Sequence, residues 1–412
     1  MSNAVETPVV NRGNAVLKEI LSGGATRALL SVLLGFVVGA LFMVFSNEAF
    51  LTAAQYFTAR PADSLAAAWT AIADGYSALF RGSIYNYTSD DIVVAFRPLT
   101  ETLRFAGPLI ASGLGIALAF RVGLFNIGAS GQLLFGALWA TWISTRVSLP
   151  WGVHLIVAAL VAILASAAYA AVVGFLKART GAHEVIVTIM MNYIAAGILT
   201  YFFRTPELLR EVDGGGTPKS DAPAQTAQLP YLLGDQYTLH WGFILAIVGV
   251  FAYWWIMERS TMGYRFRMVG HNPDAARTAG INVERTFMIA MAVSGAFVGL
   301  AAVNQALGAR AGMTPDIDGT IGFDAITVAL LGSSTAPGVL LAGLLFGAFQ
   351  AGAPAMQVIG LSPEITGVVQ GFIVLFIAAP PLVRAIFRLP PPQKSTVVAD
   401  WWRSLVTKGG RK

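Results

Sequence analysis

Apolar residues follow one another in runs of about 18–25, the length that a helix needs to cross about 30 Å of hydrocarbon, and short polar stretches separate the runs. Hydrophobic residues make up 56% of the chain and charged residues only 12%. A soluble domain is about 25% charged and could not bury so much apolar surface. The pattern predicts an all-α, polytopic membrane protein that moves a solute rather than performing soluble chemistry.

Ten membrane spans are predicted from these runs. The run from Ala28 to Ser46 is too long for the apolar part of a signal peptide, so we expect it to remain as the first span. The third and eighth spans carry glycines and polar residues (GLFNIGASGQ and TIGFDAITVALLGS), which makes them candidates for broken or re-entrant segments. The ten ranges are 28–46, 98–120, 126–145, 152–175, 185–203, 241–257, 286–307, 320–333, 338–357 and 365–387.

The positive charges give the predicted orientation. With the N-terminus inside, 18 of the 27 Lys and Arg residues fall on the cytoplasmic side and nine fall outside. Basic residues favour the cytoplasmic loops, so we predict that both termini are cytoplasmic. The expected organisation is a cytoplasmic N-terminal segment (1–27), a transmembrane permease domain (28–387) and a cytoplasmic tail (388–412).

Two outer segments are long. Residues 61–82 place five apolar side chains on one helical face, which predicts a short helix at the membrane interface. Residues 205–236 contain GGGTPKSDAPAQTAQ, a composition typical of a flexible loop. The five side chains of the predicted interfacial face are Leu65, Trp69, Ile72, Tyr76 and Leu79.

Several chemical classes are excluded. No GxxxxGK[ST] motif occurs, so the chain has no phosphate-binding loop and we expect no ATPase site of its own. His183-Glu184 begins like the zinc motif HExxH, but Val187 stands where the second histidine would be needed. Cysteine is absent, and the net charge of +5 is modest. We therefore expect no metal, no cofactor and no nucleic-acid partner, while membrane lipid surrounds the spans.

The most informative polar segment is the basic loop 258–285, within MERSTMGYRFRMVGHNPDAARTAGINVERT. Asn272 can cap a short helix that begins at Pro273, and Gly280 can end it. A small rigid helix of this kind suits a groove on another protein. An ordinary solvated loop is the alternative, and composition alone leaves both open. The candidate residues of this element are Asn272, Pro273, Asp274, Ala275, Ala276, Arg277 and Gly280.

Polar and aromatic residues in or beside the spans are candidates for a substrate pathway. Polar groups are costly in lipid, so they should face the bundle interior or a water-filled path. Neutral amides outnumber charges among them, which favours a neutral, hydroxyl-rich or heterocyclic substrate. Hydrogen bonding between helices is the alternative explanation. The candidates are Phe125, Asn126, Gln132, Glu184, Asn192, Tyr193, Asn304 and Asp324.

Four motifs together resemble the permease subunits of ATP-binding-cassette importers, in the bacterial simple-sugar and nucleoside branch related to branched-chain amino acid permeases. They are GIALAFRVGLFNIGASGQ (115–132), HEVIVTIMMNYIA (183–195), STMGYRFRMVGHNPDAARTAGINV (260–283) and GFDAITVALLGSSTAPGV (322–339). Ser130 and His183 depart from the residues common in that branch, where an acidic residue and Asn are usual.

The resemblance implies a function and its partners. Residues 271–281 would be the coupling helix that docks on an ATPase subunit, which uses the ATP. A second homologous permease subunit and a periplasmic or lipid-anchored substrate-binding protein would complete the importer in the bacterial inner (plasma) membrane. In the nucleoside group that binding protein is of the basic-membrane-protein type. From the resemblance and the neutral amides we expect a nucleoside as the substrate.

Other functions remain open at this stage. A simple sugar or another small polar solute is the nearest alternative substrate. A secondary transporter would use the broken segments 123–132 and 319–333 as an inverted repeat, but only Asp324 could serve an ion relay within a span. A purely structural membrane subunit is a further alternative, which the coupling-like loop disfavours.

Overall fold

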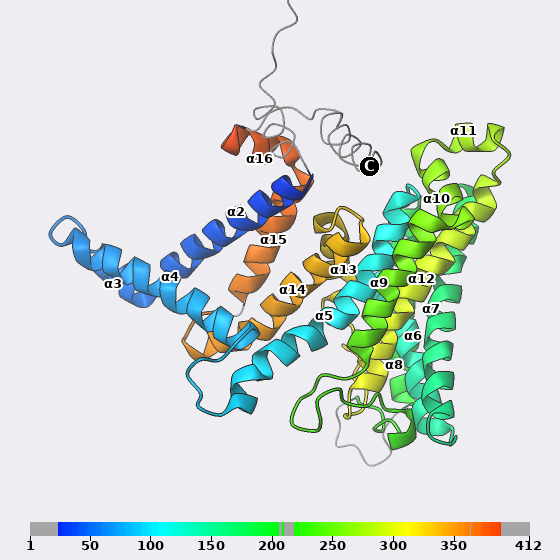
Figure 1. The fold of residues 1–412 in the computed structure, drawn as a ribbon, viewed down its shortest axis with the longest axis horizontal. Helices are drawn as coiled ribbons and strands as arrows, with labels where there is room; N and C mark the ends of the chain where they lie inside the picture. Colours follow the sequence, from blue (N-terminus) through cyan, green and yellow to red (C-terminus); the bar gives the residue numbers. More distant parts are fainter. Residues whose placement is uncertain (1–23, 206–207, 210–217, 363, 389–412) are drawn as a thin grey trace, which may run out of the picture. The chain divides into compact units, whose positions relative to one another are not determined.

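The computed structural model describes residues 24–205, 208–209, 218–362 and 364–388, and within these ranges the fold is α-helical, with no β-strand. It comprises two compact units, one holding residues up to Phe42 and from Gly367 onward, the other Met43–Thr366. Most of the expected N-terminal segment and tail lies outside the described residues. The α-helices, shown in Figure 1, are α2 Gly24–Phe45, α3 Glu48–Ala54, α4 Pro61–Ser83, α5 Ile92–Arg121, α6 Ala129–Arg146, α7 Val153–Thr180, α8 Glu184–Arg204, α9 Gly242–Arg259, α10 Thr261–His271, α11 Pro273–Thr278, α12 Val283–Gly308, α13 Ile321–Leu331, α14 Ala336–Val358, α15 Glu364–Ala378 and α16 Pro380–Phe387.

Seven of the described helices are long and apolar enough to cross a membrane: α2, α5, α7, α8, α9, α12 and α14. The pair α15 and α16 bends by 91° at its break and could form an eighth crossing. The polytopic helical prediction is confirmed. The expected third span is the 18-residue α6, and the expected eighth is α13, whose 11 residues reach only about 16 Å.

The larger unit is built around α5, which packs against α14 on one side and against α9 and α12 on the other (Figure 1). Small residues permit these close crossings. Gly115 of α5 meets the backbone of Ser294 in α12, and Gly347 of α14 meets α5 at Ala106. Close approach through glycine is the common way for membrane helices to pack, because lipid tails supply no hydrophobic drive between them.

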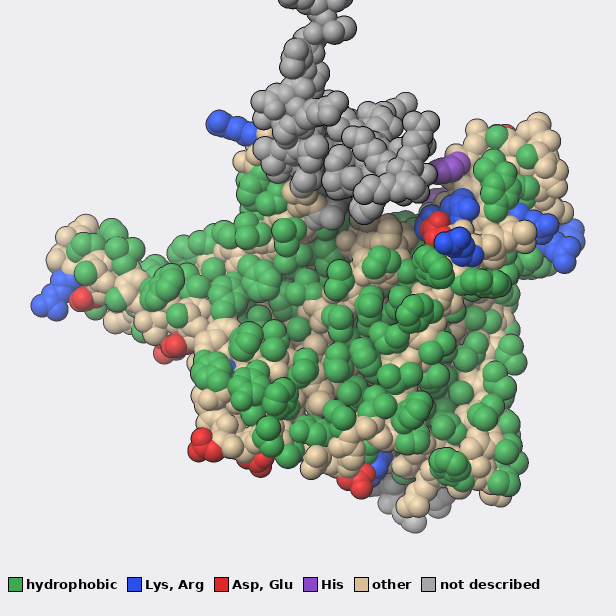
Figure 2. Space-filling model, viewed as in Figure 1, with side chains coloured by type: hydrophobic (Ala, Val, Ile, Leu, Met, Phe, Trp, Pro, Cys, Tyr) green, Lys and Arg blue, Asp and Glu red, His purple; other side chains and the backbone are tan. Residues whose placement is uncertain are grey.

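The outer surface of the larger unit is apolar where lipid is expected. Helix α8 exposes Ile186, Met190, Tyr193 and Tyr201, and only 17% of its most apolar window is buried. On the face drawn in Figure 2, hydrophobic side chains cover the helices of this unit, and most charged side chains lie toward the two ends of the bundle.

Helix α4 confirms the helix predicted for residues 61–82 but buries a different face. Its buried residues are small: Ser64, Ala71, Gly75, Ala78 and Ser83. Tyr76 and Leu79 pack against a core cluster, whereas Leu65 and Trp69 are exposed. Small residues bring this helix close to α14, and the large apolar side chains are left for the surroundings.

The smaller unit is described at α2 and the later part of α15. Gly35 of α2 lies against Ile373, and Phe42 approaches Phe372 with ring centroids 6.3 Å apart. Ala379 is not helical and separates α15 from Pro380, the first residue of α16. A proline at that position starts a helix well and cannot continue the previous one, which accounts for the sharp bend.

Candidate functional site

The connection between α5 and α6 is a buried, hydrogen-bonded break. The side chain of Asn126 is fully buried and its Oδ1 accepts from the backbone amide of Gly128 at 2.9 Å and from Gln132 Nε2 at 3.1 Å. Its Nδ2 donates to Ser294 Oγ at 3.1 Å and, more weakly, to Gln132 Oε1 at 3.3 Å. The structure thus brings Asn126 and Gln132 together and pairs both internally.

Asn192 of α8 holds the same break from another side. Its Nδ2 donates to the carbonyl of Ile127 at 3.0 Å, and its Oδ1 accepts from the amide of Gly131 at 2.8 Å. A side chain at Gly131 would lie 2.9 Å from the Asn192 backbone, so only glycine permits this approach. The first turn of α6 is therefore fastened to α8 by one amide side chain.

These contacts fix the depth of the break. Asn192 lies well inside α8 (Glu184–Arg204), and Ser294 lies near the middle of α12 (Val283–Gly308), both helices long enough to cross a membrane. Asn126 bonds to Ser294 and Gly131 to Asn192. Helix α6 therefore begins at about the middle of the bundle rather than at its end.

A second break faces the first. Met313, which follows α12, accepts a hydrogen bond from Thr141 Oγ1 near the far end of α6. Asp318 accepts a hydrogen bond from Ser130 Oγ in the first turn of α6. The chain between Met313 and Asp318 is not helical and runs along α6 into the bundle. Gly322 then packs directly on the backbone of Ser130. We call residues 123–132 and 313–324 together the midspan break.

Asp324 lies in the first turn of α13. Its Oδ2 accepts from Thr320 Oγ1 at 2.6 Å and from Gln350 Nε2 of α14 at 3.1 Å. No Lys or Arg among the described residues pairs with Asp318 or Asp324. Two carboxylates of the midspan break are thus held by neutral hydroxyl and amide donors.

The aromatic candidates do not join their neighbouring amides. Tyr193 is 71% exposed, whereas the neighbouring Asn192 bonds inward to the carbonyl of Ile127. Phe125 is 41% exposed and stacks on Phe120, with ring centroids 4.9 Å apart. Successive residues of a helix point about 100° apart, so Tyr193 and Asn192 face different surroundings on α8.

Glu184 and Asn304 lie apart from the midspan break. Glu184 pairs with Lys177 at 2.7 Å, where α7 ends and α8 begins. Asn304 donates to the carbonyl of Leu300 at 2.9 Å, and its buried Oδ1 has no hydrogen-bond partner. That oxygen lies beside Gly107 and Gly242 at the start of α9.

Sequence reasoning missed three residues of the midspan break: Asp318, Ser294 and Gln350. A signal for Asp318 existed in the segment DIDG, which directly precedes the predicted broken span. Ser294 and Gln350 are single polar residues within apolar runs, and only the packing shows that each one donates to or accepts from another helix.

At the end of α5 away from the break, Glu101 and Arg104 form an ion pair on the same helix as Arg97. Arg104 Nε donates to Glu101 at 2.8 Å, and Thr238 donates to the same carboxylate. His240 nearby is 5% exposed, and burial together with the charge of Arg104 lowers its pKa to about 4.

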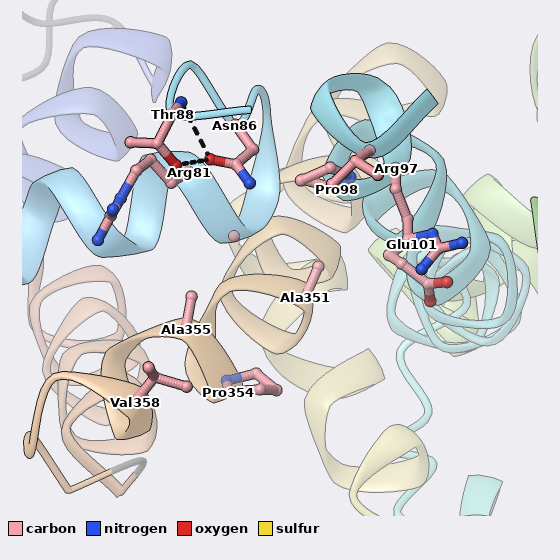
Figure 3. Close-up of a pocket in the computed structure, with 12 residues that line it drawn as sticks. Arg81, Asn86, Thr88, Arg97, Pro98, Glu101, Ala351, Pro354, Ala355 and Val358 are labelled. Carbon is pink, nitrogen blue, oxygen red and sulfur yellow. Dashed lines mark hydrogen bonds between the residues drawn. The ribbon is translucent and has the colours of Figure 1, made fainter. Parts of the chain in front are cut away.

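A cavity of about 400 Å³ lies between the end of α4, the start of α5 and α14. Figure 3 shows its polar lining: Arg97 lies beside Glu101 on α5, while the side chain of Arg81 extends away from them on α4. The guanidinium groups do not converge, so the cavity does not form an anion site.

The predicted short helix is present as α11, which follows α10 at one end of the larger unit (Figure 1). Asn272 Oδ1 caps it, accepting from the amides of Asp274 at 2.9 Å and Ala275 at 3.1 Å. Pro273 is its first residue, and Gly280 follows its end with φ +79°. All three local predictions are confirmed.

The exposed face of α11 is small and polar. Asn272, Pro273, Asp274, Ala275 and Arg277 are exposed, whereas Ala276 is fully buried. The small size of Ala276 is explained by packing within this chain rather than by a groove on a partner. Helix α11 packs on its own neighbours α10 and α12, and Ala276 is buried within this chain. Ala275 is the small residue that a partner could contact.

The end of the bundle that carries α11 is basic. Arg121 pairs with Glu258 at 2.5 Å, Arg267 lies 3.8 Å from the same carboxylate, and Arg277 pairs with Asp274 at 3.0 Å. The two pairs made by Glu258 link the end of α5 to the α9–α10 corner, whereas the Arg277–Asp274 pair lies within α11. The short capped helix α11 thus lies beside helices that are joined by ion pairs.

Comparison with known proteins identifies the family. A family model described as "branched-chain amino acid transport system / permease component" matches residues 99–378. A guanosine ABC transporter permease, NupP of Bacillus subtilis, is 37% identical over 361 residues, which cover 87% of this chain and 94% of that protein. A nucleoside permease, NupB of Lactococcus lactis, is 36% identical over 74% of this chain and 84% of its own length.

A glucose ABC transporter permease of Haloferax volcanii, TsgB13, is 33% identical over 68% of this chain and 75% of its own. No solved structure matches the chain. The helical spans, the capped α11 and these similarities agree, and the chain belongs to the family of ABC transporter permease components that includes those of branched-chain amino acid transport systems.

Proposed function

We propose that this chain is a transmembrane subunit of a bacterial ABC importer for nucleosides. Support comes from the two relatives that are themselves named guanosine and nucleoside permeases, each at least 36% identical over most of its length. The carboxylates of the midspan break are held by neutral hydroxyl and amide donors, with no Lys or Arg paired to them among the described residues, which suits a neutral, hydrogen-bonding solute. The chain contributes the path through the membrane and makes no covalent bond itself.

Energy enters through α11. This proposal rests mainly on one observation: the capped helix Pro273–Thr278 lies beside helices that are joined by ion pairs. A partner ATPase uses the ATP, so this subunit needs no cofactor. Movement of the ATPase pushes α11 as a rigid unit, and α10 and α12, which pack against α11, pass the movement to the spans. Access to the path then alternates between the two sides of the membrane.

The partners follow from the importer reading. Bacillus subtilis has a second guanosine permease, NupQ, that is 30% identical to this chain over 259 residues. We infer that this chain also works beside a second, related permease subunit. A periplasmic or lipid-anchored binding protein delivers the nucleoside, and the complex lies in the bacterial inner membrane.

Ten crossings with both termini in the cytoplasm remain our proposal for the topology. The segment 313–331 counts as one broken crossing, in which a non-helical half leads into α13. The proposed boundaries are 1–27 for the cytoplasmic N-terminal segment, 28–387 for the permease domain with its coupling loop 258–285, and 388–412 for the tail.

The topology can be tested with single cysteines, because the chain has none of its own. A cysteine at Asp235, which is exposed in the α8–α9 connection, should react with a membrane-impermeant maleimide in intact cells. A cysteine at Asn272 should react only after the cells are opened. Identical labelling at both positions would contradict the ten-crossing arrangement.

A sugar is the second candidate substrate, because the Haloferax relative is named a glucose permease. The decisive experiment is uptake by the purified complex in proteoliposomes with ATP inside. We expect saturable uptake of a radiolabelled nucleoside, and competition by other nucleosides but not by glucose. If the complex took up glucose and no nucleoside, the proposed substrate would be wrong, but the chain would still be an importer subunit.

A further inference from the structure

The non-helical stretch of the midspan break lies where backbone usually cannot be irregular. Residues 314–320 (TPDIDGT) are not helical, yet their far end reaches Ser130 at the start of α6, in the middle of the bundle. In the hydrocarbon region, irregular backbone is tolerated only where protein buries it or where it lines a water-filled cavity. Thr314, Pro315, Asp316, Gly319 and Thr320 are exposed, so burial within this chain does not explain the stretch. It therefore lines a wet path.

Asp318 is the half-buried carboxylate on this stretch and still has capacity to bind, whereas Asp316, two residues earlier, is exposed. The Oδ2 atom of Asp318 accepts from Ser130 Oγ. Within the described residues no other side chain donates to it and no cation pairs with it. An ionisable group at membrane depth is costly, and such groups usually mark a solute pathway.

The donors around the carboxylates indicate the ligand chemistry. Ser130 on Asp318, and Thr320 and Gln350 on Asp324, are all neutral hydroxyl or amide groups. An ionised carboxylate has two oxygens and only accepts hydrogen bonds, so it can take both hydroxyl hydrogens of a vicinal diol. A cation site would need more oxygen or nitrogen ligands, and the described residues contain no cluster of three or more His, Cys, Asp or Glu that could hold a metal ion.

We propose that Asp318, oriented by Ser130, binds the 2′- and 3′-hydroxyl groups of the ribose as a nucleoside passes through the midspan break. This rests on the proposed nucleoside function and assigns to it a specificity-determining residue that touches the substrate. The hydroxyls replace the water that hydrates Asp318 Oδ1 when the path is empty. Solutes without the diol leave the carboxylate short of donors and pass less readily.

The test uses the complete complex in proteoliposomes, with uptake of a ribonucleoside compared with uptake of its 2′,3′-dideoxy analogue. Each solute is supplied at a concentration that loads the binding protein equally, as measured by its intrinsic fluorescence. The variants are Asp318→Asn, which keeps the shape and can still bond to Ser130, and Ser130→Ala. Asp235→Asn, on the exposed α8–α9 connection, is the matched control.

We expect Asp318→Asn to lower ribonucleoside uptake about tenfold to a hundredfold, because it removes charge-assisted hydrogen bonds, and to change dideoxy uptake less than twofold. Ser130→Ala should produce a smaller loss with the same selectivity, and it replaces Asp318→Asn if that variant does not assemble. Asp235→Asn should change neither uptake.

Equal loss for both solutes would show that Asp318 only holds the break together, and unchanged uptake would show that it has no role; either result overturns the proposal. Dependence of uptake on Na⁺ or on a proton gradient, lost in Asp318→Asn, would assign the carboxylate to a cation instead. Failure of the proposed function is distinct, because the unmodified complex would then take up no nucleoside at all.

Discussion

Helix α11 and the midspan break both interrupt the apolar pattern with polar residues, but the structure uses the two interruptions in opposite ways. In α11 the cap Asn272 satisfies the backbone and the polar side chains face outward. In the break, Asn126, Gln132 and Asn192 bond to one another or to backbone and are mostly buried. A polar residue beside a span therefore indicates a partner or pathway only when its bonding capacity is left unused.

The largest effect is expected at Asn126. Changing Asn126 to Leu would leave the Gly128 amide, Gln132 and Ser294 short of partners, at about 1–3 kcal/mol for each buried group. We expect most folded protein to be lost from the membrane together with uptake. Asn192→Leu should do the same to a smaller extent, because Asn192 is less buried and makes two bonds.

Membrane-extracted protein, measured by fluorescence-detected size exclusion, checks this prediction. If Asn126→Leu gave normal amounts of folded protein but no uptake, Asn126 would have to bind the substrate directly. The sequence left both a pathway role and hydrogen bonding between helices open for Asn126, and the four hydrogen bonds of the buried side chain favour the second.

The next effect is at α11. Gly280→Val places a β-branched residue at φ +79°, which costs about 1 kcal/mol or more, although a Cβ there would meet open space. Ala276→Trp overfills a fully buried site, and overpacking typically costs about 1–3 kcal/mol. Both variants should still insert into the membrane, because only the packing of α11 against α10 and α12 is disturbed. Nucleoside uptake by the complex should be lost.

Ala275→Trp is the matched control for a partner contact, since Ala275 is exposed beside the buried Ala276. We expect it to leave the melting temperature of the isolated subunit unchanged and to lower nucleoside-stimulated ATP hydrolysis by the complex at least tenfold. Normal uptake by all three variants would mean that the loop is merely a solvated connector.

How much of this could be read from the sequence differs between the two regions. The α11 helix was predictable residue by residue, because an Asn cap, a Pro at the first position and a closing Gly act locally. The break at 123–132 was recognised as irregular, but the second break lies before the predicted segment 320–333, most of which is the helix α13. The partners of the two breaks were not recognised, because Ser294 and Gln350 come from helices far along the chain, and only the packing brings them to the break.

A smaller effect is expected from His240, whose pKa falls from 6.5 to about 4 in the folded chain. Because the unfolded chain binds a proton on this histidine more readily than the folded chain does, the folded state is favoured at a pH above 6.5, the pKa in the unfolded chain. This contribution to stability is lost as the pH falls toward 4, the pKa in the folded chain. Between pH 7 and pH 5 the loss should be about 2 kcal/mol. Thermal unfolding of the purified subunit across this range measures it, and His240→Gln should flatten the dependence. An equal acid dependence in both proteins would contradict the assignment.

The smallest effect is expected from Arg310→Ala. Arg310 pairs with Asp235 at 2.9 Å, but both side chains are largely exposed, 55% and 85%. Exposed pairs contribute about 0–1 kcal/mol, so thermal stability and uptake should change little. A loss comparable to that of Asn126→Leu would show that exposed bonds matter as much as buried ones and would undo the contrast between the two regions.

Cross-linking from α11 tests the central claim most directly. Because the chain has no cysteine, a single cysteine at Ala275 of the assembled importer can be joined to a nearby engineered cysteine by a short bismaleimide. We expect a cross-link from position 275 to the ATPase subunit, whose yield changes when ATP is added, and none from a cysteine at Asp235. No cross-link from position 275, or an equal one from position 235, would contradict it.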